Sequence, residues 1–260
     1  MLISAQDLVK KSANLYKDNF NLFFKLAFLV TIPSIITTSL VGALTAIFGR
    51  QSQEFFVTVI YGLFFIILFI ISYVIGIWFS IVKVRIIAAR YENKDIASIS
   101  SYIHSDKKLI LPVIAASILA GIAIIGGFIL FIVPGIIFSV WFAFVMYAVA
   151  IDNKESVDSL SYSKSLSKGR WLAVLWRILV PISFFLVGTY LMQTPLSIVL
   201  NTFDSVIIIT LVAIASFLIN ILFTPFLVAS QVILYSNLKN TMATENSISV
   251  PNTTTDEPPF

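Results

Sequence analysis

The sequence predicts an all-α fold, a polytopic membrane helix bundle, and three observations lead to this prediction. Hydrophobic residues make up 58% of the 260 residues and charged residues only 12%, whereas about a quarter of the residues in soluble proteins are charged. The charged residues gather in short polar clusters separated by long uncharged runs. Lys and Arg fall almost entirely on one side of the topology that these runs imply. We therefore expect residues 1–240 to form an integral membrane domain.

The uncharged runs are long enough for six membrane-spanning helices. A helix needs about 20 apolar residues to cross the hydrocarbon core of a bilayer. The run from Leu109 to Ile151 is too long for one helix, so we expect the Val133-Pro134-Gly135 turn to divide it into two spans. The predicted spans lie near residues 22–48, 55–82, 109–132, 134–151, 171–194 and 205–238.

The placement of Lys and Arg predicts the orientation. With the N-terminus inside, every Lys and Arg except Arg50 lies on the inner side, as the positive-inside rule requires. Both termini are therefore predicted to be cytoplasmic. We attribute the net charge of +4 to the membrane topology and to contact with anionic lipid headgroups. No alternation of basic and aromatic residues supports a nucleic-acid partner, so the expected partners are membrane lipids and another membrane protein or a second copy of this chain.

A polar amphipathic segment precedes each pair of predicted spans, and we expect three surface helices there. In the first segment, Ser4 and Asp7 have capping spacing, and Ile3 and Leu8 are placed as a hydrophobic staple. In the second segment, Asp95 is the expected cap, and the periodic apolar residues are Ile96, Ile99 and Ile103. The chain thus repeats one unit three times: a surface helix, a basic edge and two spans.

The third segment, DNKESVDSLSYSKSLSKGRW from Asp152 to Trp171, carries a stripe of serines on one helical face: Ser156, Ser159, Ser163 and Ser167. Asp152 and Glu155 have capping-box spacing, and Gly169 marks the end of the helix. Small residues at this spacing permit close backbone approach, so we expect an interfacial helix packed by its serine stripe. A flexible serine-rich loop is the alternative, and a phosphorylation or ligand site has no specific support.

Four basic residues at this edge are expected to contact lipid headgroups: Lys164, Lys168, Arg170 and Arg177. Arg177 is the deepest of them, about two turns inside the fifth span. A long basic side chain at this depth can snorkel to the interface, and we prefer that interpretation to a substrate-binding arginine.

The run FIVPGIIFSVWFAFVMYAVAIDNKESVDSLSYSKSLSKGRWLAVLW resembles the central signature of a broad family of prokaryotic six-helix membrane proteins. It is similar to the membrane domain attached to some glycerophosphoryl diester phosphodiesterases. The matching residues are Pro134, Gly135, Trp141, Asp152, Ser163, Leu166, Lys168, Gly169 and Trp171. The resemblance implies the fold and a location in the cytoplasmic membrane of a prokaryote. No soluble catalytic domain follows the membrane part, so phosphodiesterase activity is not expected.

The residue inventory argues against an enzyme. The chain has no Cys, and His104 is its single His, so thiolate catalysis and cysteine-based metal sites are excluded. No Asp or Glu lies inside a predicted span, which also disfavours proton-coupled transport. We expect no metal and no cofactor.

One polar face lies inside the predicted spans, on the sixth: Ser216, Asn220, Thr224 and Gln231, with Tyr235 near its inner end. Polar groups in lipid are costly unless they are paired, so we expect either interhelical hydrogen bonding or a polar groove for a lipid headgroup or small amphiphile. Span two offers a complementary stripe of Ser72, Gly76 and Ser80.

The predicted function is that of a non-enzymatic membrane scaffold or accessory protein. The alternative is a transporter or flippase for a lipid or small amphiphile, with the sixth-span face lining its path. Residues 241–260 are polar, rich in Thr and Pro, and without periodicity, so we predict a disordered cytoplasmic tail.

Overall fold

The computed structural model describes residues 2–48, 55–96, 98–203 and 205–249, and these residues form helices and no strand. The helices that match the predicted spans are α2 (Phe20–Phe48), α3 (Phe55–Tyr91), α5 (Ile110–Leu130), α6 (Ile132–Trp141) with α7 (Val145–Asp152), α9 (Trp171–Thr202) and α10 (Val206–Ser249). Within the described part of the chain, six helical segments are long and apolar enough to cross a membrane. The predicted all-α polytopic fold is confirmed.

A short helix precedes each pair of spans, as the repeat predicts. These helices are α1 (Ala5–Asp18), α4 (Ile99–Ser105), which a 3₁₀ turn η1 (Asp106–Leu109) continues, and α8 (Ser156–Ser167). Ser4 caps α1 by accepting a hydrogen bond from the Asp7 amide at 3.0 Å. The cap of α4 is Ser98, which accepts from the Ser101 amide at 3.1 Å, and not Asp95 as expected.

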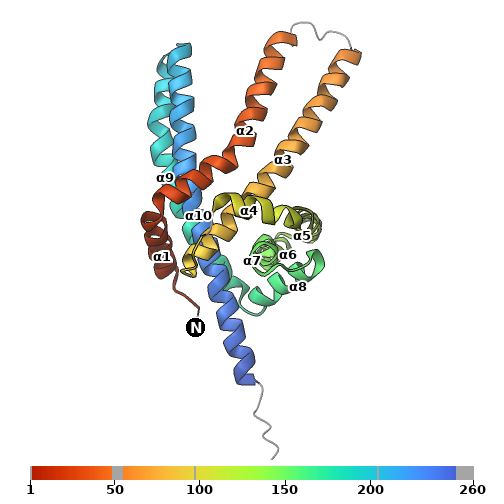
Figure 1. The fold of residues 1–260 in the computed structure, drawn as a ribbon, viewed down its shortest axis with the longest axis vertical. Coiled ribbons are helices and arrows are strands. Elements are labelled where there is room, and N and C mark those ends of the chain that lie inside the picture. Colours follow the sequence, from red (N-terminus) through yellow and green to blue (C-terminus); the bar gives the residue numbers. More distant parts are fainter. Residues whose placement is uncertain (1, 49–54, 97, 204, 250–260) are drawn as a thin grey trace, which may run out of the picture.

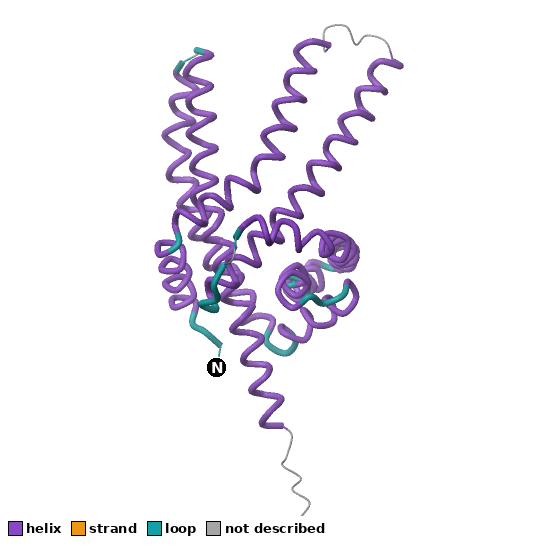
Figure 2. The backbone as a smooth tube through the Cα atoms, viewed as in Figure 1, coloured by secondary structure: helices purple, strands orange, loops and turns teal. Residues whose placement is uncertain are grey.

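The three pairs of spans meet at one end of the molecule and point apart at the other. In Figure 1, α9 and α10 run side by side, α2 and α3 separate toward their tips, and α5 and α6 are seen nearly end-on. Figure 2 shows the same arrangement as a nearly unbroken set of helical tubes. Helices α1 and α8 lie at the meeting end, where α1 packs against α9 and α10, and α8 packs against α5, α6 and α7.

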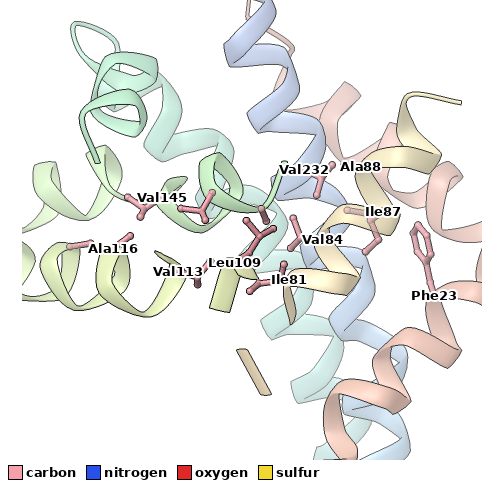
Figure 3. Close-up of a cluster of buried hydrophobic side chains, with 14 residues drawn as sticks. Phe23, Ile81, Val84, Ile87, Ala88, Leu109, Val113, Ala116, Val145 and Val232 are labelled. Atoms are coloured by element: carbon pink, nitrogen blue, oxygen red, sulfur yellow. The ribbon is translucent and has the colours of Figure 1, made fainter. Parts of the chain in front are cut away.

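The buried core lies at this meeting end, which we call the junction. One cluster joins α2, α3, α5, α7 and α10 through Phe23, Ile81, Val113, Val145 and Val232 (Figure 3). A second cluster centres on the buried side chains of Leu8, Phe144, Leu166 and Tyr235. The arms beyond the junction expose large apolar side chains, an arrangement that is stable in lipid and unfavourable in water.

The chain turns between α5 and α6 at Phe131, whose extended backbone (φ −163°) separates the two helices. The predicted turn at Val133-Pro134-Gly135 is therefore wrong by a few residues. Pro134 lies in the first turn of α6, where no intrahelical hydrogen bond is lost. Gly135 serves close packing, since a Cβ atom there would lie 2.4 Å from the Phe128 ring.

Helix α10 continues to Ser249, so residues 241–249 are helical where disorder was expected. Extending an existing helix adds one hydrogen bond per residue and needs no new nucleus. Thr241 and Met242 also pack at the junction, which polar composition alone does not reveal. The rest of the predicted tail, 250–260, and the predicted outer loop at 49–54 lie outside the described residues.

Candidate functional site

The serine stripe of α8 holds together a break in the fourth predicted span. Regular helix stops at Trp141 and resumes at Val145. The Ser163 hydroxyl donates to the Trp141 carbonyl at 2.6 Å and accepts from the Phe144 amide at 3.2 Å. One side chain therefore pairs two backbone groups that a continuous helix would pair internally.

The other serines of the stripe also bind backbone. Ser167 donates to the Val140 carbonyl at 3.3 Å, and Ser156 donates to the Pro112 carbonyl at 3.2 Å. Ser159 bonds within α8, to the Ser156 carbonyl at 2.7 Å. Ser159, Ser163 and Ser167 are fully buried. The segment is thus a packed helix and not a flexible loop.

The expected capping box of α8 does not form. Glu155 occupies the N-cap position without a side-chain hydrogen bond. Asp152 instead accepts hydrogen bonds from the Tyr235 hydroxyl and the Lys239 ammonium on α10. Capping is a local interaction, and here a long-range ion pair with the partly exposed Lys239 takes the carboxylate.

Tyr162 of α8 lies close to this group. Burial raises the pKa of the Tyr162 phenol, and the negative charge of Asp152 raises it further against the opposing charge of Lys239. Asp152 therefore joins α7 to α10 by hydrogen bonds and acts on Tyr162 of α8 through its charge.

The basic residues near α8 are engaged to different degrees. Arg177 donates to the Ile3 and Ala173 carbonyls, and Arg170 donates to the Leu166 carbonyl and the Thr241 hydroxyl. Lys164 lies 4.6 Å from the centroid of the Trp141 ring, and Lys168 is exposed. Arg170 and Arg177 hold protein groups, where lipid contact was expected, and headgroup contact by Lys164 and Lys168 stays a prediction.

The predicted polar face of α10 does not form one groove. The exposed Asn220 amide donates to the Ser216 carbonyl at 2.8 Å, and Thr224 donates to the Asn220 carbonyl at 2.6 Å. Both hydrogen bonds stay within α10, so the expected interhelical bonding at these positions is wrong. Tyr235 is buried with Asp152, about 22 Å along the helix from Asn220 by the helical rise. The cavities beside α10 are lined by other residues, among them Phe223, Phe226 and Phe217.

A second ion pair, which the sequence analysis did not identify, joins α3 to η1. Arg85 binds Asp106, whose side chain is fully buried. The guanidinium group of Arg85 also lies 5.9 Å from the Tyr102 ring centroid. A carboxylate just before the third predicted span, with an Arg just after the second, is the sequence signal that could have indicated this pair.

The second predicted span and its neighbours line an open cavity of about 380 Å³. It lies between α2, α3, α5 and α7, and its polar lining consists of side chains with hydroxyl groups: Ser34, Ser72, Tyr73, Ser80 and Ser117. Gly76 lies in the same wall. The stripe of Ser72, Gly76 and Ser80 therefore faces a cavity and not the α10 face.

The described residues contain no group of three His, Cys, Asp or Glu side chains that could hold a metal ion. The imidazole of His104 lies 2.9 Å from the Ser100 carbonyl of its own helix.

No protein-family model matches the chain, and neither a curated protein nor a solved structure matches it. The resemblance to the membrane domain of glycerophosphoryl diester phosphodiesterases therefore stays a prediction that rests on the residues that carry it.

Proposed function

We propose that this protein is a non-enzymatic scaffold or accessory protein of a prokaryotic cytoplasmic membrane, with both termini in the cytoplasm. The observation that carries the proposal is the use made of polar groups at the junction. Asp152, Asp106 and Arg177 each bind partners within the fold. Polar groups that bind other parts of the fold in this way stabilise the junction, and this use supports a structural role.

The proposed partners are membrane lipids and another membrane protein or a second copy of the chain. The arms present large apolar side chains to their surroundings, for example Ile122 on α5 and Tyr190 on α9, which are 64% and 69% exposed. Diverging arms give a membrane protein more surface for contact with lipids and neighbouring helices than a closed bundle of the same helices. The family resemblance agrees with a non-catalytic membrane role.

A lipid transporter is the second candidate, and the hydroxyl-lined cavity between α2, α3 and α5 is the observation in its favour. The path would then run beside Ser34 and Ser72, and not along Asn220 and Gln231 as the sequence suggests. Polar groups inside a membrane domain are a usual feature of transport paths.

Reconstitution into liposomes separates the two candidates. A fluorescent lipid placed in both leaflets and quenched from outside reports movement between leaflets. We expect the lipid to move between leaflets at the same rate as in protein-free liposomes. A several-fold faster rate would favour the transporter function over the scaffold function.

Photo-crosslinking in the native membrane tests the scaffold directly. A photoreactive residue at Ile122 or Tyr190 should give a protein adduct of one defined mass. Lipid adducts alone, from every arm, would contradict the scaffold.

A further inference from the structure

The hydroxyl-lined cavity gathers several serines whose side chains have no hydrogen-bond partner among the described residues. Several span hydroxyls outside it donate to their own helix backbone: Ser139 to the Gly135 carbonyl, Ser183 to Leu179 and Ser197 to Thr194, at 2.8 to 2.9 Å. This back-bonding is the usual way to pair a hydroxyl in a membrane helix. Others, such as the buried hydroxyl of Thr189 on α9, have no partner among the described residues. The four serines at the cavity are Ser34, Ser72, Ser80 and Ser117, and no hydrogen bond joins their side chains to the described residues.

Hydrocarbon cannot pair these four hydroxyls, and an unpaired polar group in lipid is costly. They come from three helices, with Ser34 on α2, Ser72 and Ser80 on α3, and Ser117 on α5. An occupant with several oxygen atoms would therefore be bound from more than one side.

The remaining wall decides the class of occupant. No charged side chain lines the cavity, and its apolar wall includes Phe69, Ile77 and Met146. A charged headgroup would find no counter-ion among the side chains of this wall. A neutral head with a hydrocarbon tail fits both parts of the wall.

We propose that this cavity binds an uncharged glyceride, of the diacylglycerol type, with its hydroxyl and ester oxygens on the four serines and its acyl chains along the apolar wall. Lipid binding at this site is additional to the proposed scaffold function. It is expected whether the protein only holds the lipid or also moves it between leaflets. Gly76 leaves room for the head, since a Cβ atom there would meet no other atom within 4 Å.

The test uses the full chain in nanodiscs of phosphatidylcholine that contain a small fraction of photoactivatable diacylglycerol. Cross-linked peptides are measured by mass spectrometry. We expect adducts on α3 between Phe69 and Ser80, displaced by unlabelled diacylglycerol and not by phosphatidylglycerol. Equal displacement by phosphatidylglycerol would overturn the assignment to an uncharged lipid.

The first variant replaces Ser34, Ser72, Ser80 and Ser117 by Ala. It removes no hydrogen bond within the described residues, so the fold should be retained. Adducts should fall about tenfold, as expected for the loss of two or more modest hydrogen bonds. The matched control replaces Ser139, Ser183 and Ser197 by Ala and should keep the wild-type yield. Equal losses in both variants would overturn the site.

The second variant, Gly76→Leu, fills the cavity without disturbing its serines. Gly62→Leu on the same helix is its control, because a Cβ atom at Gly62 also meets nothing within 4 Å and Gly62 does not line the cavity. Gly76→Leu should lower the adduct yield at least as much as the serine variant, and Gly62→Leu should not. Unchanged labelling in Gly76→Leu would place the lipid elsewhere and overturn the proposal, whatever the liposome assay shows about transport.

Discussion

At the scale of the residue, single polar side chains decide how the helices end. Ser163 hydrogen-bonds to both the Trp141 carbonyl and the Phe144 amide. Asp152 accepts hydrogen bonds from Tyr235 and Lys239. Leaving a buried backbone group without a hydrogen-bond partner lowers the free energy of unfolding by about 1–3 kcal/mol. A few such contacts therefore contribute substantially to stability. Ser163 reaches the break between α6 and α7, and Asp152, the last residue of α7, reaches two side chains on α10.

Ser163→Ala should destabilise the protein by about 2–6 kcal/mol, because one buried and one partly buried backbone group lose their partner at about 1–3 kcal/mol each. Unfolding in mixed micelles by titration with a denaturing detergent measures the change. Ser161→Ala, on the exposed side of α8, is the matched control and should change stability by less than about 0.5 kcal/mol. Equal effects of the two substitutions would show that the serine bridge is not needed.

Tyr162 should make the fold sensitive to alkali. Its pKa in the folded protein is raised above the ordinary value of 10.0, so its contribution is complete below that value and is lost as the pH rises through the folded pKa. Tyr162→Phe should therefore lose less stability than the wild type from about pH 9 to 11. Thermal unfolding across this range measures both slopes, and identical slopes would contradict the expectation.

At the scale of the element, the short helices tie the long ones together. The segment before α1 is held at Ile3, whose amide donates to Asn237 at 2.9 Å and whose carbonyl accepts from Arg177. Helix α4 is held to α3 by Trp78, which donates to the Ile103 carbonyl at 3.1 Å. The start of α1 is thus held by α9 and α10, and α4 is held by α3.

Arg177→Ala should loosen α1, because the Ile3 carbonyl loses a charged donor and such bonds contribute about 1.5–3 kcal/mol. Hydrogen exchange of the α1 amides should accelerate about tenfold or more, while exchange in α5 stays unchanged. Arg177→Lys should not restore protection, since a single ammonium does not reproduce a planar guanidinium that reaches two carbonyls. The exposed Lys168→Ala serves as the control, and rapid exchange in it as well would argue against the Ile3 anchor.

At the scale of the whole molecule, one junction supports three diverging pairs of helices. Buried apolar side chains concentrate where the pairs meet, and the arms expose theirs. The chain has no Cys, so single cysteines can be introduced without a background. This makes the proposed orientation directly measurable.

A membrane-impermeant maleimide should label Arg50→Cys in intact cells and label Lys11→Cys only after the membrane is opened. The reason is the positive-inside distribution, which puts the N-terminal lysines in the cytoplasm. Labelling of Lys11→Cys from outside would reverse the topology, and the signal of Arg50→Cys should then disappear.

Part of the site could be predicted because it depends on periodicity. The serine stripe follows from helical spacing, and its burial is observed at Ser159, Ser163 and Ser167. Its partner could not be predicted, since the break after Trp141 lies in the run Phe142-Ala143-Phe144, which contains no Pro or Gly to indicate it. The polar residues of α10 show the opposite case. Their helical spacing is as predicted, but the structure does not bring them together in a groove or pair them with another helix.

The sequence by itself determined the membrane class, the six apolar helices and the three short helices that precede their pairs, because each depends on local hydrophobicity, charge and helical period. Only the tertiary structure decided which faces meet: Ser163 on the break at Trp141, Asp152 on Tyr235, and Ser72 beside an open cavity. The physical reason is that lipid and protein are both apolar neighbours. A membrane helix is hydrophobic on all sides, so its sequence does not distinguish a face that packs on protein from a face that meets lipid.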